Sequence, residues 1–309
     1  AGAITFTVTL SGVSAWLVTV DWATADGTAA APGDYTGGSG TLTFAPGDTS
    51  ETVVVPVVDD LTDEPTESFT AALSNPANAS IGTGSGTGTI LDDDPQPVIT
   101  GDDPALPENS ATYGFTISLD RPSAYTVTVQ WAGAVSGPCT TLPLATWGVG
   151  GDLDYVVPGW QTVTFAPGVT SQPVAFQAFD DGIDEPDEHF CLALQAPANA
   201  SILGGGWPAV INGTATIVDD EAPPAASIDS LPALPEAGPA TFTVTLDRPS
   251  ASTVTVDWAT ADGTATAGAD YTAASGTVPF GPGATSEAVA VTLTDDGTDE
   301  PNETFTVGM

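Results

Sequence analysis

The sequence has almost no positive charge. Its 309 residues include 40 aspartates and glutamates but two basic residues, Arg121 and Arg248, which gives a formal net charge of −38 at pH 7. Proteins that bind phosphate groups need arginine or lysine to displace counterions. This composition therefore excludes nucleic acid and anionic membrane surfaces as direct partners.

The chain also lacks long apolar segments. No run approaches the roughly 18 apolar residues of a membrane-spanning helix. The first residues have neither the basic start nor the apolar stretch of a signal peptide. We therefore expect no direct insertion into a membrane, and targeting information, if there is any, lies outside this segment.

Cysteine is scarce as well. The two cysteines, Cys139 and Cys191, match no metal-type Cys-x-x-Cys spacing. A single disulfide between them is one interpretation, and it favours an oxidising compartment. Two buried free thiols are the other.

What the sequence does contain is typical of many short strands. Hydrophobic residues make up 41% of the chain, enough to form cores despite the charge, and 34 glycines and 27 prolines provide turns. Apolar residues alternate with Thr, Ser or Asp at 4–10 and 253–258, which is the period of half-buried strands. Further strands are predicted around 40–45, 51–58, 67–73 and 86–91. Six or seven antiparallel strands of this kind form a two-layer sandwich whose recurring aromatic residues belong to the core.

The same pattern occurs three times. Residues 21–28 return almost unchanged at 257–264, with a shorter match at 130–132 between them, so the period is near 118 residues, the size of a domain. Acidic, proline-rich joints at 92–97 and 219–224 predict extended, stiff connections. We therefore predict an all-β protein with tandem sandwich domains at 1–94, 97–221 and 226–309.

Comparison of the three copies predicts incomplete ends. The first copy lacks the stretch before its first matched strand, and the third lacks its last strand. The second is complete and carries an insertion at 136–153. A segment of a longer repeat protein is the simplest interpretation, and a polymer whose chains donate strands to one another is the alternative.

Acidic residues fall at equivalent places in the three copies, mostly in loops that a sandwich gathers at one end. Two carboxylates about 4 Å apart repel by roughly 4 kcal/mol at an effective dielectric near 20, so a cluster needs either a counter-cation or raised pKa values. With two arginines and no lysine in the chain, the cation has to come from outside. Oxygen ligands on flexible loops select Ca²⁺ over Mg²⁺, and the scarcity of histidine and thiolate argues against zinc and copper.

The alternative is that these acids form a solvated surface, but such a surface would not repeat in register three times. That interpretation fits the remaining acids, among them Asp21, Asp48, Glu51, Asp102, Asp120 and Glu287.

Several ordered motifs resemble the Calx-beta domain. They are Asp-Gly-Thr-Ala with Gly-Asp-Tyr, Gly-Thr-Leu-Thr-Phe-Ala-Pro-Gly, Val-Asp-Asp with Glu-Pro and Glu-Ser-Phe, Leu-Ser-Asn-Pro, and a terminal Ile-Leu-Asp-Asp-Asp. This immunoglobulin-like module occurs in the regulatory loop of sodium–calcium exchangers and in long bacterial surface proteins. The resemblance covers essentially the whole chain and implies tandem immunoglobulin-like β-sandwich domains.

The resemblance also implies a ligand set for calcium in each copy. The second copy has every position: Glu108, Asp154, Asp180, Asp181, the carbonyl of Ile183, Glu185, Glu188, Asp219, Asp220 and Glu221. The first lacks the initial glutamate and has Asp34, Asp59, Asp60, the carbonyl of Thr62, Glu64, Glu67, Asp92, Asp93 and Asp94. The third lacks the terminal acids and has Glu236, Asp270, Asp295, Asp296, the carbonyl of Thr298, Glu300 and Glu303. We therefore expect only the second site to bind calcium with full affinity.

The insertion of the second copy contains Cys139 and Trp147. A bond from Cys139 to Cys191 would tie this loop to the strand after the glutamates. A contact surface for a partner is conceivable there, but stabilisation of the loop is the favoured role.

These features favour a calcium-stiffened rod outside the cell, serving as a stalk, adhesin or fibre on an extracellular or cell surface, with a bacterial source expected. Its partners would be calcium ions, neighbouring repeats, further copies of the chain, or a surface receptor or glycan. A calcium-sensing regulatory module is an alternative that micromolar or tighter affinity would indicate. A carbohydrate-binding module is another, and it would need exposed aromatics, for which the candidates are Trp147, Trp160 and Trp207.

An enzyme is not expected. Carboxylate pairs serve glycosidases, but a catalytic pair occurs once and these acids occur in triplicate. His189 is the one histidine, and we expect it to pack or to meet solvent beside Glu188. No Ser-His-Asp arrangement, phosphate loop or zinc motif is present.

Overall fold

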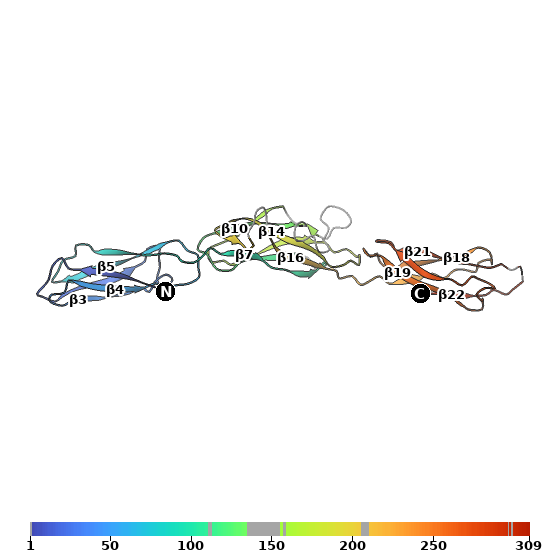
Figure 1. Cartoon of the computed structure of the whole chain (residues 1–309), viewed down its shortest axis with the longest axis horizontal. Helices are drawn as coiled ribbons and strands as arrows, with labels where there is room; N and C mark the ends of the chain where they lie inside the picture. Colours follow the sequence, from blue (N-terminus) through green and yellow to red (C-terminus); the bar gives the residue numbers. More distant parts are fainter. Residues whose placement is uncertain are drawn as a thin grey trace.

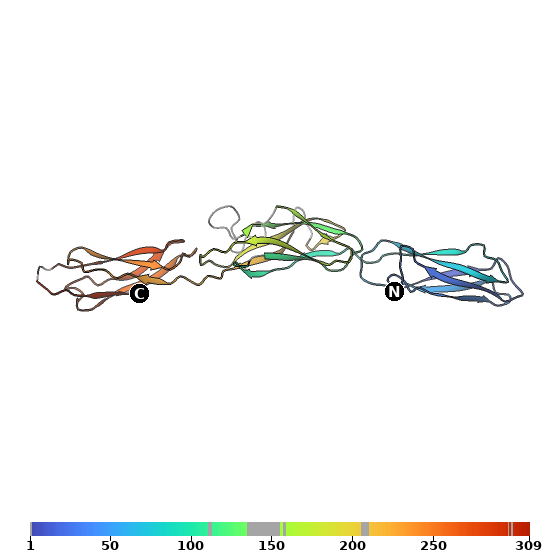
Figure 2. The ribbon, with the colours of Figure 1, turned by 180° about the vertical axis from the view of Figure 1, so that it is seen from behind.

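The chain forms a rod of three β-sandwiches placed end to end (Figures 1 and 2). A computed structural model describes residues 2–110, 113–134, 155–156, 159–204, 210–295, 297 and 299–309. Within these ranges all regular structure is β-strand, and no helix there is long and apolar enough to cross a membrane. The predicted class, all-β with tandem immunoglobulin-like sandwiches, is confirmed. The insertion predicted at 136–153 lies outside the described residues.

The first sandwich has two sheets, in which β1 pairs with β4 and the other strands follow the order β3-β2-β5-β6. Alternation of residues such as Ile4, Phe6 and Val8 with threonine turns one face of each strand inward. The strands lie close to the predicted ranges and are β1 (Ala3–Thr9), β2 (Val18–Ala25), β3 (Ser39–Phe44), β4 (Ser50–Pro56), β5 (Glu67–Ala77) and β6 (Ser85–Ile90).

The second sandwich repeats this plan and adds edge strands. Its sheets have the orders β12-β10-β14-β16-β8 and β11-β13-β9-β7-β15. The expectation of purely antiparallel pairing is wrong here, because β7 pairs with β15, and β8 with β16, in parallel. The strands are β7 (Val98–Gly101), β8 (Ala105–Pro107), β9 (Tyr113–Leu119), β10 (Val127–Ala134), β11 (Tyr155–Val156), β12 (Gln161–Phe165), β13 (Ser171–Ala178), β14 (Glu188–Ala198), β15 (Ser201–Ile202) and β16 (Val210–Val218).

The third sandwich has two three-stranded sheets, β17-β18-β21 and β20-β19-β22. Strand β17 pairs with β18 as β7 pairs with β9. The strands are β17 (Ala226–Ile228), β18 (Pro239–Leu246), β19 (Val254–Asp262), β20 (Ser275–Phe280), β21 (Ser286–Thr292) and β22 (Phe305–Gly308). The strands of all three sandwiches fall within the predicted domains, whose boundaries stay a prediction.

The recurring aromatic residues form the cores, as predicted. Phe44, Phe165 and Phe280 hold the same place in the three sandwiches and are completely buried. The ring of Tyr35 stacks on Phe69 with a centroid separation of 4.1 Å, and a corresponding stack occurs in the third sandwich at 4.5 Å. In the first and third sandwiches the stacked tyrosine is the residue directly after a predicted ligand, Asp34 or Asp270, so this part of the core lies next to the predicted site.

Several acids expected to be plain solvated surface instead hold strands together. A carboxylate oxygen of Asp120 accepts a hydrogen bond from the backbone nitrogen of Val98, at 2.6 Å, and Asp102 accepts one from that of Thr116, at 2.7 Å. The two oxygens of Asp21 accept from the side chains of residues 41 and 75. The sequence-based expectation is wrong for these residues because an acidic side chain at a strand end is well placed to bond neighbouring backbone or side-chain donors.

Candidate metal centres

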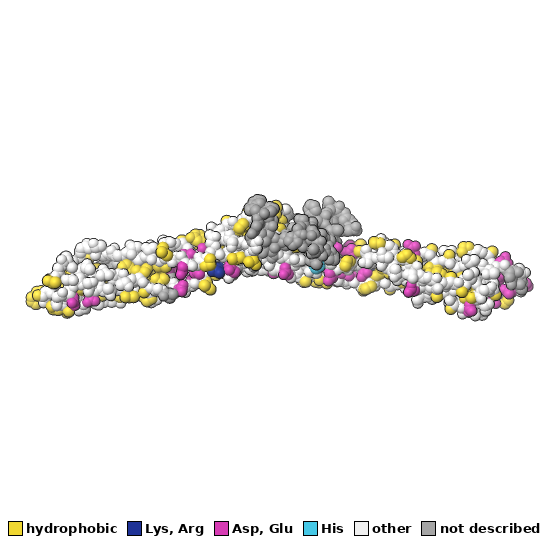
Figure 3. Space-filling model, in the orientation of Figure 1, with side chains coloured by type: hydrophobic (Ala, Val, Ile, Leu, Met, Phe, Trp, Pro, Cys, Tyr) yellow, Lys and Arg dark blue, Asp and Glu magenta, His cyan; other side chains and the backbone are white. Residues whose placement is uncertain are grey.

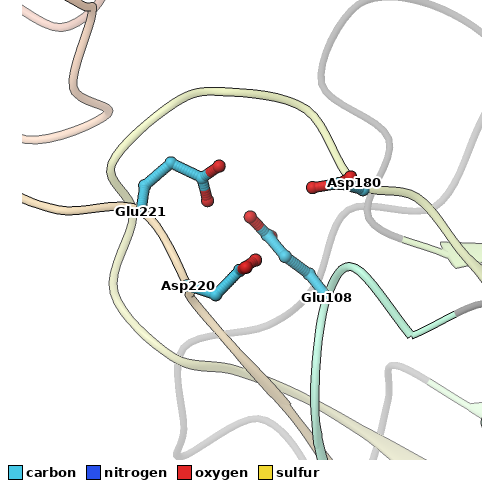
Figure 4. A group of neighbouring side chains, drawn as sticks. All are labelled: Glu108, Asp180, Asp220 and Glu221. Carbon is cyan, nitrogen blue, oxygen red and sulfur yellow. The ribbon is translucent and has the colours of Figure 1, made fainter.

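Four carboxylates from three separate segments converge in the second unit (Figure 4). Glu108, Asp180, Asp220 and Glu221 each place an oxygen within 4.8 Å of those of the other three. Glu108 directly follows β8, and its backbone nitrogen donates to the carbonyl of Val218 at 3.0 Å. The parallel pairing of β8 with β16 thus carries this glutamate to the acidic segment that follows β16.

The electrostatics of this cluster favour a positive ion. Glu108 is 6% exposed, and one of its oxygens, like one of Glu221, is buried without a hydrogen-bond partner. Burial, a hydrogen bond with Glu221 and the nearby negative charges raise the pKa of Glu108 to about 9. The group therefore holds a proton at neutral pH where a cation would allow it to ionise.

Two further predicted ligands, Asp181 and Asp219, lie close enough for their charges to add to the pKa shift of Glu108. Asp219 accepts a hydrogen bond from the backbone nitrogen of Glu185 at 3.1 Å, and Asp181 accepts one from that of Ile183 at 2.8 Å. Glu188 is the first residue of β14. Asp154 lies outside the described residues, so its place in the site stays a prediction.

In the first unit, Asp34, Glu64 and Glu67 bring oxygens within 4.8 Å of one another. Burial and the surrounding carboxylates raise the pKa of Glu64 to about 7. Burial and the charge of Asp34 also raise the pKa of Glu67. A single hollow at the end of the sandwich includes most of the ligands predicted here: Asp34, Asp59, Asp60, Thr62, Glu64, Asp92, Asp93 and Asp94.

The third unit gathers Asp270, Glu300 and Glu303 in the same way, again within 4.8 Å. Burial and the charge of Asp270 raise the pKa of Glu303, and Glu236 contributes to that shift. Asp295 follows β21 and accepts a hydrogen bond from the backbone nitrogen of Gly297 at 3.2 Å. The predicted ligands Asp296 and Thr298 lie outside the described residues.

Two of these clusters lie beside joints of the rod, where Asp and Glu side chains gather (Figure 3). At the first joint, Asp63 lies in a backbone bridge with Ser123 of the next unit, and its carboxylate accepts from the Ser123 hydroxyl at 2.9 Å. The carbonyl of Asp63 also accepts from the backbone nitrogen of Ala124 at 2.9 Å. Asp63 is 5% exposed and Ser123 is 2% exposed. We call this set of bonds the first clasp.

The second joint uses the same bonds. Asp184 accepts from the hydroxyl of Ser250 at 2.8 Å, and its carbonyl accepts from the backbone nitrogen of Ala251 at 2.9 Å. Each aspartate also donates its backbone nitrogen to a proline carbonyl, of residue 122 or 249, at 3.3 Å. We call this set of bonds the second clasp. The same hydrogen bonds therefore hold both joints of the chain.

Sequence reasoning missed these four clasp residues. Asp63 and Asp184 were expected to be solvated surface, and that expectation is wrong because a serine of the next unit covers them. The motifs recur in the sequence: Asp-Glu-Pro occurs at 63–65 and 184–186, and Ser-Ala at 123–124 and 250–251. Asn109 was also missed, and its side-chain amide donates to Asp220 beside the cluster.

The remaining predictions concern single residues. Cys191 is disulfide-bonded, which agrees with the disulfide interpretation, and Cys139 lies outside the described residues. His189 is half-buried, and its Nδ1 lies 3.0 Å from the hydroxyl of Thr216. Trp160 is 45% exposed, whereas Trp147 and Trp207 lie outside the described residues.

Hard oxygen donors from several loops suit calcium. Clusters of three or four carboxylates, buried oxygens without partners and raised glutamate pKa values are what a site for a divalent cation presents before it binds. The described residues of these clusters include no sulfur or imidazole donor, which disfavours zinc and copper.

Comparison with known proteins gives relatives of two kinds. The chain is 28% identical over 319 aligned residues to the mouse Extracellular matrix organizing protein FRAS1, an alignment that covers 96% of this chain and 8% of that protein. It is 47% identical over 58 residues to the dog Sodium/calcium exchanger 1, covering 19% of this chain and 6% of the exchanger. The chain therefore spans less than a tenth of either protein. Both are animal proteins, so the expected bacterial source gains no support.

Among solved structures, the calcium binding domain CBD12 of CALX1.1 is 23% identical, with a TM-score of 0.31 over 63% of this chain and 73% of that one. The family model of the Calx-beta domain matches residues 1–94, 150–221 and 233–309. These three matches take in most of the sequence, one in each sandwich. The chain belongs to the Calx-beta domain family.

Proposed function

We propose that this chain is a calcium-binding segment of an extracellular repeat protein, in which calcium stiffens the joints between domains. One observation carries the proposal: candidate ligands and clasp residues alternate within a single loop. Thr62 and Glu64 are predicted ligands and flank Asp63, the clasp residue. Ile183 and Glu185 flank Asp184 in the same way.

This alternation couples the site to the joint. The ion would supply the positive charge that the chain lacks, held in the second unit by Glu108, Asp180, Asp220, Glu221 and their neighbours. A loop whose ligands are fixed presents Asp184 to Ser250 with little further loss of conformational freedom. Without calcium, repulsion between the carboxylates loosens the loop and lets the joint flex.

The relatives support the setting of this proposal. Similarity to a protein named as an extracellular matrix organiser favours a place outside the cell, where millimolar calcium matches the affinities of extracellular modules, roughly 10⁻⁴ to 10⁻³ M. The disulfide at Cys191 agrees with an oxidising compartment. A stalk, adhesin or fibre fits this setting, with a receptor or glycan as its target and without enzymatic activity.

The test is a calcium titration of the whole chain by calorimetry, with melting temperature and small-angle X-ray scattering followed on the same samples. Millimolar binding, a clear rise in melting temperature and a narrower range of rod lengths are expected. A variant with Glu108→Gln and Glu221→Gln should lose most of this response. Its matched control, Glu51→Gln with Glu287→Gln, removes two charges outside the clusters and should keep the response.

Two results would contradict the proposal. Micromolar or tighter binding with little change in rod stiffness would instead indicate a calcium sensor. If no calcium binds, the carboxylates are better interpreted as a solvated surface.

A further inference from the structure

A five-residue sequence, Pro-Ala-Asn-Ala-Ser, occurs twice in the chain, at 76–80 and 197–201. In each copy the asparagine directly follows a long strand, Asn78 after β5 and Asn199 after β14. Each copy contains Asn-x-Ser, the sequence at which secreted proteins accept an N-linked glycan. So short a sequence also arises by chance, and the structure around it has to decide its meaning.

The two asparagines have the same local structure. The backbone φ is 60° at Asn78 and 58° at Asn199, in the left-handed region. The side-chain amide of Asn78 donates to the carbonyl of Leu17 at 2.8 Å, and that of Asn199 donates to the carbonyl of Thr126 at 2.9 Å. Asparagine tolerates this backbone conformation and bonds nearby backbone groups, so the turn alone explains its presence.

The turn does not explain the serine two residues later. Ser80 and Ser201 are exposed, and neither hydroxyl has a hydrogen-bond partner among the described residues. Ser201 contributes its backbone nitrogen, which donates to the carbonyl of Pro97 at 2.9 Å and could come from most other residues. A glycan acceptor sequence, in contrast, requires a hydroxyl at this position.

A neighbouring position shows how much variation these turns accept. Three residues before the asparagine, the first copy has Asn75 and the second has Ala196, and both have positive φ. The fold therefore does not keep asparagine wherever the backbone is left-handed. Both Asn and Ser are nevertheless present in the two copies of the acceptor sequence.

Asn199 is accessible at a joint that both of its units form. Thr126, whose carbonyl Asn199 binds, comes three residues after Ser123 of the first clasp. Although the first unit is attached at this end of the second sandwich, the side chain of Asn199 is exposed. Its Nδ2 carries two hydrogens, and the bond to Thr126 uses one of them. The other hydrogen can be replaced by a sugar.

Two further Asn-x-Thr sequences, at 212–214 and 302–304, have different settings. Asn212 lies within strand β16, and the residue after Asn302 is the predicted ligand Glu303. The hydroxyl of Thr304 lies 3.4 Å from that of Thr264, so the fold uses it. Neither sequence forms an exposed turn with an unused hydroxyl.

We propose that Asn78 and Asn199 are sites of N-linked glycosylation, with a lipid-linked oligosaccharide as the donor. Nδ2 attacks the anomeric carbon of the first sugar and gives up one proton. The new C–N bond replaces the C–O bond to the diphosphate, and the lipid diphosphate leaves. The remaining hydrogen on Nδ2 keeps the bond to the carbonyl of Leu17 or Thr126.

The inference rests on the proposed function for its extracellular setting alone, because N-linked glycans belong to secreted proteins. It adds a bulky, solubilising group to a chain whose other surface feature is negative charge. At Asn199 this group lies beside the first joint and hinders the close side-by-side approach of another rod there.

The test uses the full chain, secreted from cultured animal cells whose secretory pathway supplies the donor. Peptide N-glycosidase in heavy-oxygen water converts each glycosylated asparagine into a labelled aspartate, and mass spectrometry of peptides cut after acidic residues locates the label. Most molecules should carry the label at both Asn78 and Asn199. Unlabelled asparagine at these two positions overturns the inference.

Serine variants separate modification from the structure of the turn. Ser80→Ala with Ser201→Ala keeps both asparagines but should abolish the two glycans, whereas Ser80→Thr with Ser201→Thr should keep them. The alanine variant, made in a bacterial host that adds no glycan, should have the same melting temperature as the native chain from that host. The matched control is Asn75→Gln, an exposed asparagine followed by Pro76 and so outside any acceptor sequence, and it should keep both glycans. Glycans that persist in the alanine variant overturn the inference.

Calcium calorimetry on the same samples keeps the two proposals distinct. Calcium binding by a chain without these glycans refutes the glycosylation sites alone. Glycans at both sites without calcium binding refute the calcium-stiffened joint alone.

Discussion

The predicted ligand sets of the first and second units differ in one glutamate, and the carboxylates that meet within 4.8 Å differ too: Asp34, Glu64 and Glu67 in the first unit, and Glu108, Asp180, Asp220 and Glu221 in the second. In the second unit, Glu108 lies buried at the centre of the cluster, and its pKa is raised to about 9. In the first unit, burial and the neighbouring carboxylates raise the pKa of the half-buried Glu64 to about 7. The third unit has its corresponding glutamate, Glu236, but that side chain is exposed.

The cluster of the second unit depends on the edge strand β8 as well as on the acidic residues themselves. Strand β8 pairs in parallel with β16 and places Glu108 against the segment that begins at Asp219. The sequence stops at residue 309, before the positions that would match β16, and Glu236 is exposed in the structure. In the second unit it is the pairing of β8 with β16 that brings Glu108 into the cluster.

The largest expected effect comes from Glu108→Gln. Removing a buried carboxylate should weaken calcium binding at the second site by about 10- to 100-fold, because affinity follows the number of charged ligands. The same change should stabilise the calcium-free protein, since a buried acid is replaced by a neutral amide. Glu236→Gln should change affinity by no more than about threefold, because that group is exposed. Calorimetry measures the calcium affinity, and thermal unfolding with a chelator measures the stability of the calcium-free protein. Equal losses of affinity in the two variants would contradict the distinction between the two units.

The next effect is a dependence on pH in the calcium-free protein. Folded Glu108 keeps its proton up to about pH 9, whereas an unfolded glutamate loses it near about pH 4.3. The folded state therefore binds more protons in this window, and the free energy of unfolding should fall as the pH rises through it. Urea unfolding between pH 5 and 9 with a chelator measures the slope.

Two comparisons sharpen that measurement. Glu108→Gln should flatten the slope, and a rise in stability with pH in the native chain would refute the explanation. Calcium binding at pH 7 should release protons, which calorimetry in buffers of different ionisation enthalpy counts. The second site should release more than the first, because Glu64 titrates near pH 7.

A smaller effect is expected at the joints. Ser123→Ala leaves the buried carboxylate of Asp63 without its hydroxyl partner, and a hydrogen bond to a charged group contributes about 1.5 to 3 kcal/mol. The first joint should therefore sample a wider range of angles, seen as broader distances between spin labels on the first and second units. Ser14→Ala is the matched control, since the Ser14 hydroxyl accepts the same bond from its loop backbone as that of Ser123 but makes no clasp. Equal broadening in both variants would show that the loop, and not the clasp, sets the joint.

The smallest effect concerns a feature that the outer units share. The hydroxyls of Tyr35 and Tyr271 each donate to an aspartate at 2.6 Å, and this bond lowers the pKa of the aspartate. Tyr35→Phe and Tyr271→Phe should reduce stability slightly and equally above pH 4, and the loss should vanish at lower pH where the aspartate is protonated. Thermal unfolding of both variants tests this, and unequal losses would mean that the two ends of the rod are not equivalent.

Most of the fold follows from local pattern, so the sequence predicts it well. The alternation of apolar residues with threonine at 4–10 corresponds to strand β1. The repeated Phe-Ala-Pro-Gly motif begins at the buried last residue of β3 and of β12. The acidic clusters could also be anticipated, because acids in register in three copies have to meet wherever the loops meet. Comparison of the three copies thus allowed us to predict which acidic residues lie close together in space.

The parts that could not be predicted depend on partners in distant segments. The clasps join Asp63 to Ser123 and Asp184 to Ser250, and the recurring motifs that contain these residues do not by themselves show which residues meet across a joint. The parallel pairing of β8 with β16 joins segments more than 100 residues apart, which alternation within either segment does not predict. The bonds of Asp102 and Asp120 depend on which backbone nitrogen ends up opposite the carboxylate.

The repetition of the clasp has a consequence for the shape of longer assemblies. The same bonds at successive joints amount to one screw operation applied again at each step, so a long run of such units follows a helical path. A side chain on the surface then returns to the same side of the axis after a fixed number of units. Features that recur once per unit, such as exposed loops, trace a spiral along such a run.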